Sequence, residues 1–262
     1  MSLVFLQKKG AIATVQLNRP EKRNAMSFAL LRELVATADQ IRKDKSIRVV
    51  ILTGVGESFS AGIDLSDLND KKKTVFALWE LIKPGQSLFQ KAFLVWQDLP
   101  VPVIAALHGH CLGAGMQLAL AADIRIATPT CKLSIMEGRW GLVPDMGLTQ
   151  TLKGIVPLDV AKELTMTARM LTGKEAEKLH LVTHVATDPL AAAETLAQEL
   201  LTRSPDALLA SKRVLDAMQH QPHRSLRLEK IWQLKLLISK NRQIAMRKDK
   251  KPELEYQPRQ YR

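Results

Sequence analysis

Two carboxylates, Glu137 and Asp145, stand eight residues apart in a largely apolar stretch that glycine and proline interrupt. Two carboxyl groups in one cleft can act as acid and base, because different surroundings move their pKa values apart. The same spacing also allows Glu137 to pair with Arg139 and Asp145 to cap the start of a helix. The residues alone leave both interpretations open.

Two loops of small residues could supply main-chain hydrogen-bond donors. The sequence SFSAGIDL at 58–65 follows the strand-like run RVVIL at 48–52, and HGHCLGAGMQ at 108–117 leads into an apolar helix. Small residues let N–H groups approach a ligand closely, and a helix start offers free N–H groups and the positive end of its dipole. Two such donors can hold a developing oxyanion. Each loop taken alone is explained as well by a packing turn.

A metal site and a disulfide framework are not expected. His108 and His110 could form a metal-binding pair, but no nearby Cys, His or Asp cluster completes a site at the required spacing. The chain has two cysteines, Cys111 and Cys131, too few for a disulfide framework. We therefore expect a reducing compartment and a cytoplasmic location. The N-terminal residues do not resemble a signal peptide, and polar residues interrupt the longest apolar stretch, so no membrane span is expected.

The positive charge needs an explanation. The chain of 262 residues has a formal net charge of +12 and 46% hydrophobic residues, a composition typical of a globular protein. Residues 235–262 carry nine Lys or Arg against three Asp or Glu, which is half of the surplus. Such a surplus fits nucleic acid, a membrane surface or a polyanionic small molecule.

The hydrophobic pattern predicts an α/β protein in which strand-then-helix units precede an all-helical end. A loop is expected at 53–70. Strands are expected at 3–7, 11–17, 48–52, 101–107, 123–128 and 182–185. Helices are expected at 28–43 after a cap at Ser27, at 71–98 with a break at Pro84 and Gly85, and at 116–122, 144–155, 158–168, 174–179, 191–201, 204–218 and 226–247.

Five segments in order resemble the enoyl-CoA hydratase/isomerase (crotonase) superfamily. They are LNRPEKRNAMS at 17–27, FSAGIDL at 59–65, PVIAALHGHCLGAGMQLALAADIRIA at 102–127, GLVPDMGLTQ at 141–150 and LTGKEAEKLHLV at 171–182. The resemblance covers nearly the whole chain. It implies a spiral of ββα units at 1–197, which holds the active site, and a C-terminal helical trimerisation module at 198–262.

The same resemblance implies the substrate and the binding residues. Acyl-CoA thioesters are the substrate class, coenzyme A enters as part of the substrate, and no separate cofactor is needed. A homotrimer or homohexamer is implied. The two oxyanion donors would be the N–H groups of Ala61 and Ala114, the latter replacing a usual glycine. The CoA path would include Lys22, Arg23, Ala25, Ala61, Gly62, Ile63, Asp64 and Leu65.

The carboxylates indicate which reaction the resemblance implies. Hydratases of the family have glutamates at the positions of both Gln117 and Glu137, and an amide cannot carry a proton at neutral pH. Enoyl-CoA isomerases that move a double bond from C3 to C2 use a single glutamate at the Glu137 position, so an enoyl-CoA isomerase is also implied. Dienoyl-CoA isomerases use this glutamate and an aspartate eight residues later, which is Asp145 here. Their pattern is the most similar, although that subfamily usually has aspartate at the position of Gln117. His180 is a further departure, since it replaces a helix-ending glycine.

Three alternatives stay open. A hydratase, or another crotonase-type lyase or hydrolase, could use Glu137 alone with an activated water. An RNA-binding relative could use the basic end, but no aromatic-interleaved motif accompanies it. A catalytically inactive scaffold is disfavoured by the presence of both Glu137 and Asp145. Gln117 could orient a water or the thioester, or face the cleft with no chemical role.

Overall fold

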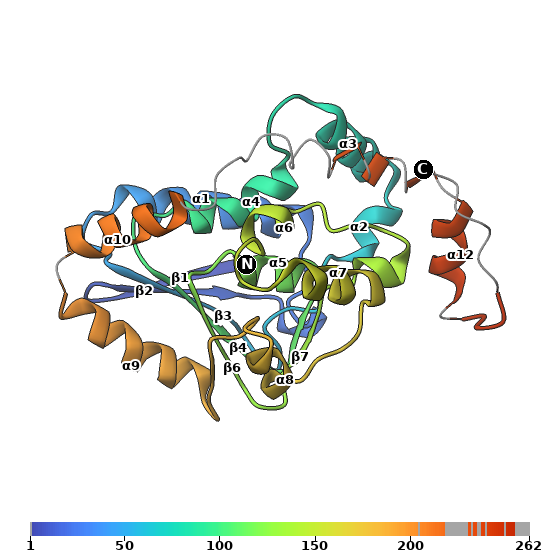
Figure 1. Cartoon of the computed structure of the whole chain (residues 1–262). Helices are drawn as coiled ribbons and strands as arrows, with labels where there is room; N and C mark the ends of the chain where they lie inside the picture. The colour runs from blue at the N-terminus through green and yellow to red at the C-terminus, as the bar shows by residue number, and fades with distance from the viewer. Residues whose placement is uncertain are drawn as a thin grey trace.

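The computed structural model describes residues 2–203, 205–217, 230–231, 233–234, 237–238, 240–248 and 250–254. A twisted sheet lies at its centre, with helices on both faces (Figure 1). The α/β class and the order of strand-then-helix units agree with the prediction.

Six strands form the main sheet in the order β1-β2-β3-β4-β6-β8. Their bounds are β1 Val4–Lys9, β2 Ile12–Leu17, β3 Val49–Gly54, β4 Val103–Leu107, β6 Ile124–Ala127 and β8 His184–Val185. β1 and β2 form the predicted antiparallel hairpin, and all the later pairs are parallel. Because parallel neighbours share their direction, the loops that follow β2, β3, β4 and β6 leave the same edge of the sheet.

Alternation along the strands gives the sheet two apolar faces. On β3, Val50 and Leu52 belong to the larger core, whereas Val49 and Ile51 face the smaller one. The helix α9 (Pro189–Leu201) covers the smaller core, while α1 (Phe28–Lys43), α4 (Leu88–Gln97) and α5 (Ala114–Leu120) lie on the other side (Figure 1). Burial on both faces explains why these strands are continuously apolar.

The remaining helices are short or lie at the periphery. They are α2 (Leu65–Asn69), α3 (Lys71–Ile82), α6 (Leu148–Thr151), α7 (Leu158–Thr167), α8 (Gly173–Lys178), α10 (Pro205–Ala217) and α12 (Lys240–Lys248), with the 3-10 turns η1 (Pro20–Lys22) and η2 (Glu137–Trp140). Ser27 caps α1 as predicted, and its hydroxyl accepts the N–H of Leu30. His180 adopts the left-handed conformation, with φ 62°, after α8.

Several local predictions were wrong. The segment 144–155 was expected to be helical, but only α6 forms, because residues 142–147 run irregularly and Gly147 begins the helix with φ 93°. The expected loop at 53–70 contains α2. A second, two-stranded parallel sheet of β5 (His110–Leu112) and β7 (Lys132–Ser134) was not predicted. Three-residue strands are too short to show a periodic pattern.

The C-terminal part is described only in segments. Lys212 on α10 is buried and bonds Asp123 at 2.8 Å and the carbonyl oxygen of Val101 at 3.1 Å, which anchors this helix to the core. The expected cap at Ser204, the end of that helix at 218 and most of 226–239 lie outside the described residues. The boundary predicted after residue 197 falls inside α9, and the division into two units stays a prediction.

Asn24 ties the loop after β2 to the loop after β3. Its side chain donates to the carbonyl oxygens of Val55 and Ser58, at 2.9 and 2.7 Å, and accepts the N–H of Arg19 at 2.8 Å. It is fully buried and has φ 55°, a conformation that asparagine tolerates better than most residues.

Replacing Asn24 with alanine should lower the free energy of unfolding by about 3 kcal/mol, because each main-chain group left unpaired in the interior costs about 1–3 kcal/mol. Urea denaturation measures the change. Asn69→Ala, at an exposed site on α2, is the matched control and should change the free energy by less than about 0.5 kcal/mol. Equal losses in the two variants would contradict this role of Asn24.

Candidate functional site

Main-chain hydrogen bonds join the loops at the carboxyl edge of the sheet. The N–H of Met26 donates to the carbonyl oxygen of Gly62 at 2.7 Å, and the N–H of Asp64 donates to the carbonyl oxygen of Met26 at 3.0 Å. In the same way, Ser60 exchanges bonds with His110 and Leu112 at 2.8 and 3.0 Å. The loops 19–26, 58–64 and 108–114 therefore lie side by side.

These bonds bring the predicted CoA-binding residues together. Lys22 and Arg23 are exposed, Ala25 is half-buried, and all three adjoin the segment 61–65. In that segment Ile63 is half-buried and Leu65 is exposed, whereas Gly62 and Asp64 are buried. The structure thus joins two segments, 22–26 and 61–65, that are distant in the sequence.

The Asp64 carboxylate forms an ion pair. Its Oδ2 lies 2.9 Å from Arg19, and its Oδ1 accepts the N–H of Ser66 at the start of α2. Burial opposes ionisation of this carboxyl, but the bonds from Ser66 and Arg19 outweigh burial and lower its pKa. Asp64 thus holds the loop in place as an anion.

The two predicted oxyanion donors differ in availability. The N–H of Ala61 donates to the carbonyl oxygen of Arg23 at 2.9 Å, which contradicts the prediction that it is free to bind a ligand. Two residues later, the N–H of Ile63 has no acceptor within the described part of the chain. Ala114 is the first residue of α5, where helical N–H groups have no partner within the helix.

Gly62 brings these two N–H groups close together. It has φ +100°, and a Cβ at this position would lie 3.0 Å from the carbonyl oxygen of Leu112 and 3.8 Å from the amide nitrogen of Ala114. A larger residue would be strained here and would crowd the Ala114 amide. The close approach of the loops therefore depends on glycine.

Glu137 lies beside the start of α5. Its Oε1 accepts a hydrogen bond of 2.7 Å from Nε2 of Gln117, while its Oε2 is buried and has no hydrogen-bond partner among the described residues. Burial raises the pKa of this carboxyl, although nearby main-chain N–H groups and the Gln117 amide partly offset the rise. A carboxyl with a raised pKa and a vacant oxygen is suited to take up and release a proton.

The alternative pairing for Glu137 is not present. Arg139 is exposed and lies against the ring of Trp140, with 5.9 Å between its guanidinium carbon and the ring centroid. Among the described residues no ion pair joins Arg139 to Glu137.

Asp145 is buried at 7% exposure, and Gly147 rather than Asp145 precedes α6, so Asp145 does not cap that helix.

Gln117 connects the two carboxylate-bearing segments. Besides its bond to Glu137, its Oε1 accepts the N–H of Met146, the residue after Asp145, at 3.1 Å. The sequence left Gln117 without a defined role, because a glutamine in an apolar helix does not indicate which chain segments fold against it.

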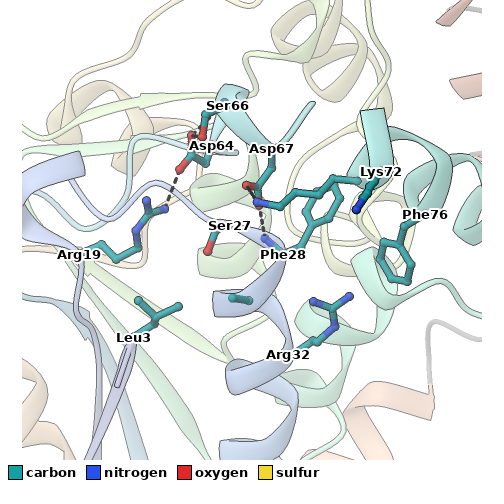
Figure 2. A pocket seen from close by; sticks show the side chains of 12 residues that line it. Leu3, Arg19, Ser27, Phe28, Arg32, Asp64, Ser66, Asp67, Lys72 and Phe76 are labelled. Atoms are coloured by element: carbon teal, nitrogen blue, oxygen red, sulfur yellow. Dashed lines mark hydrogen bonds and ion pairs between the residues drawn. The ribbon is translucent and has the colours of Figure 1, made fainter. Parts of the chain in front are cut away.

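One pocket lies next to this centre rather than at it. Its volume is about 600 Å³, and among the predicted CoA-binding residues only Asp64 lines it. Figure 2 shows Arg19 turned toward Asp64 on one side, and Asp67, Lys72, Phe76 and Arg32 on the other. Basic side chains thus gather beside the segment 61–65, and the sequence analysis did not select them.

His108 and His110 form hydrogen bonds within the chain. His108 Nε2 lies 3.0 Å from the carbonyl oxygen of Gly56, and His110 Nδ1 lies 3.0 Å from Oγ of Ser58. Within the described residues no three His, Cys, Asp or Glu side chains gather as a metal site would require. Both histidines instead bind the loop after β3.

No described helix is long and apolar enough to cross a membrane.

Comparison with known proteins identifies the family. The model of the family "Enoyl-CoA hydratase/isomerase" matches residues 7–251. The chain belongs to this family. It is 38% identical over 252 residues to the mouse mitochondrial Delta(3,5)-Delta(2,4)-dienoyl-CoA isomerase, covering 89% of this chain and 76% of the relative. It is 33% identical over 216 residues to the short-chain-enoyl-CoA hydratase of Clostridium acetobutylicum, covering 81% and 80%.

A solved structure agrees with the assignment. A protein from Thermobifida fusca YX, described as an enoyl-CoA hydratase in complex with CoA, superposes with a TM-score of 0.75 at 35% identity. The match covers 90% of this chain and 93% of the other. Membership of the enoyl-CoA hydratase/isomerase family, its crotonase-like α/β fold and the similarity to dienoyl-CoA isomerases are thereby confirmed.

The raised pKa of Glu137 predicts a pH-dependent stability. Because the folded protein binds this proton more tightly than the unfolded chain, the associated stabilisation is present below the ordinary pKa of 4.5 and is lost as the pH rises through the folded-state pKa. Glu137→Gln keeps an acceptor for Gln117 but does not titrate. Its stability relative to the wild type should therefore increase from about pH 5 to about pH 8.

Urea denaturation at the two pH values measures this difference. Glu194→Gln, at an exposed site on α9, controls for the loss of one negative charge. A stability difference between Glu137→Gln and wild type that is the same at both pH values, or that shrinks as the pH rises, would contradict the raised pKa.

Proposed function

We propose that the protein is a dienoyl-type acyl-CoA isomerase that moves double bonds along the acyl chain of a CoA thioester. The observation that carries the proposal is that Gln117 bonds both to Glu137 and to the main chain of Met146, the residue after the buried Asp145. This centre lies beside the N–H groups of Ile63 and Ala114, which have no acceptor among the described residues. The similarity to the mouse dienoyl-CoA isomerase supports the same substrate class.

The N–H groups of Ile63 and Ala114 bind the thioester oxygen. Negative charge develops on this oxygen when a proton leaves C2, and two donors stabilise the resulting dienolate. Ile63 replaces Ala61 in this role because, of these two N–H groups, that of Ile63 has no acceptor in the described part of the chain.

Glu137 takes the C2 proton and Asp145 supplies a proton to C6. A Cβ on Gly113 would lie 3.5 Å from Glu137 Oε1, so this carboxyl adjoins the Ala114 donor and hence the thioester end of the substrate. As C6 gains its proton, the dienolate electrons return from the oxygen and leave double bonds at C2 and C4. The transfer consumes no cofactor, and coenzyme A enters only as part of the substrate.

The CoA moiety lies along residues 61–65, with Lys22, Arg23 and Ala25 at its adenosine or phosphate end. Exposed cations beside a polyanion lower its energy and increase its rate of encounter. Residues 235–262, at the C-terminal end, carry half of the net positive charge, and these cations would attract the same phosphates.

We also propose a homotrimer or homohexamer, and a cytoplasmic location. One face of α3 supports assembly, since Val75, Leu78, Trp79 and Ile82 follow helical spacing and are all exposed in the single chain. Light scattering on the purified protein distinguishes a monomer from a trimer or hexamer.

The carboxylates are tested one at a time with a 3,5-dienoyl-CoA substrate. Glu137→Gln and Asp145→Asn should each lower the rate of isomerisation by about 10²–10⁴-fold, because each removes a positioned acid or base. The exposed Asp159 on α7 provides the control Asp159→Asn, which should retain the wild-type rate.

Ultraviolet absorbance separates isomerisation from hydration. An isomerase shifts the chromophore of the dienoyl substrate, whereas a hydratase consumes that of a trans-2-enoyl-CoA. The proposal expects the first activity and little of the second, since Gln117 cannot carry a proton. Rapid hydration without isomerisation, or full activity in both carboxylate variants, would overturn it.

Replacing single amide groups with esters tests the two oxyanion donors. An α-hydroxy acid in place of Ile63 removes its N–H and should lower kcat by about 10²–10³-fold. The same change at Ala61 removes the bond to Arg23 and should lower stability while kcat changes little. A larger loss of kcat at position 61 than at 63 would return the role to Ala61.

A further inference from the structure

The side chain of Gln117 has no part in the proton transfer described above, yet it is fully buried in the first turn of α5. Its amide spans two other segments of the chain. It donates a hydrogen bond of 2.7 Å to Oε1 of Glu137 and accepts one of 3.1 Å from the N–H of Met146. A buried amide with both ends bonded holds its neighbours in fixed positions.

The orientation of this amide follows from the chemistry of its partners. A main-chain N–H can only donate, so the oxygen of Gln117 must face Met146. The NH₂ group then faces Glu137, where a carboxylate oxygen accepts it. A carboxylate at position 117 could still accept from Met146 but could donate to Glu137 only after binding a proton.

This orientation determines where Glu137 carries a proton. Oε1 already accepts from Gln117, so a proton bound by Glu137 belongs on Oε2. Oε2 is buried and has no partner in the described structure. One oxygen of the carboxyl is thus held in place, and the other is left for proton transfer.

We propose that Gln117 is a positioning residue that confines proton exchange by Glu137 to Oε2 and fixes the Asp145 segment relative to it through Met146. The inference rests on the proposed isomerase function for its kinetic consequences. Its structural content, the hydrogen bond to Glu137, can be tested without any substrate.

The polar groups that bond to Glu137 are uncharged: the Gln117 amide and the main-chain N–H groups of Met136 and Glu137. α7 and α12 pack against η2. α5 carries no charged side chain, and Asp159, Lys162 and Glu163 of α7 are exposed. The other charged groups are Arg139 of η2, Asp145, and Lys240, Arg242 and Arg247 of α12. No ion pair within the described residues joins any of these groups to Glu137.

Two substitutions separate the two bonds. Gln117→Met has a similar length and loses both, whereas Gln117→Glu keeps the acceptor for Met146 and loses the neutral donor. Gln198→Met and Gln198→Glu, at an exposed site on α9, are the matched controls. The kinetic measurement is the pH profile of kcat and KM on the dienoyl-CoA substrate.

Gln117→Met should lower kcat by about 10²-fold, as misplacement of a catalytic group does, with little change in KM. The acid limb of its profile should move to higher pH, because the buried Glu137 carboxylate loses its donor. Gln117→Glu should add a second titration, since two adjacent carboxyls share one proton. Profiles identical to the wild type in both variants would overturn the inference, whatever the loss of kcat.

A measurement on the wild-type protein provides a test that does not depend on activity. With glutamine selectively labelled with ¹⁵N, the side-chain NH₂ signal of Gln117 should shift as Glu137 titrates, and the shift should disappear in Glu137→Gln. A Gln117 signal that does not follow the titration of Glu137 would refute the bond even in an active isomerase. An inactive wild type with the titration present would instead refute only the proposed function.

Discussion

The site depends on main-chain hydrogen bonds that join successive loops at the carboxyl edge of the parallel sheet. Each loop binds the next: residues 19–26 pair with 58–64, which pair with 108–112, and Gly113 donates to the carbonyl oxygen of Ser134 at 2.9 Å. The N–H of Ala61 is engaged in one of these bonds, to the carbonyl oxygen of Arg23. Among the described residues the N–H groups of Ile63 and Ala114 have no acceptor, and the proposed oxyanion site depends on this.

Burial and hydrogen bonding act in opposite directions on Glu137. Enclosure of the carboxyl raises its pKa, and the amide of Gln117 partly counteracts the rise without adding a charge. A second carboxylate at the same place would repel Glu137 and compete for its proton. The neutral Gln117 amide therefore bonds to Glu137 without adding a charge, while its bond to Met146 fixes the segment that carries Asp145.

The sequence predicted the strands of the main sheet and most helices, because burial on two faces imposes clear periodic patterns on residues such as 48–52 and 28–43. It also selected Glu137, Asp145 and Ala114 through their motifs. It did not predict β5 and β7, the irregular path of 142–147, or the exchange of Ala61 for Ile63 as the free donor. Those features depend on hydrogen bonds between loops that are distant in the sequence. The spacing of residues along the chain does not show which N–H group these bonds leave without an acceptor.

Exchange of hydrogen at C2 of a 3,5-dienoyl-CoA tests the central claim, that Glu137 exchanges a proton at C2 while Asp145 acts at the far end of the diene. In deuterated water, mass spectrometry follows deuterium entering C2 and, separately, the formation of product. Asp145→Asn should still exchange C2 hydrogen at a rate near that of the wild type while forming little product, and Glu137→Gln should do neither. Exchange at the wild-type rate in Glu137→Gln would contradict the account.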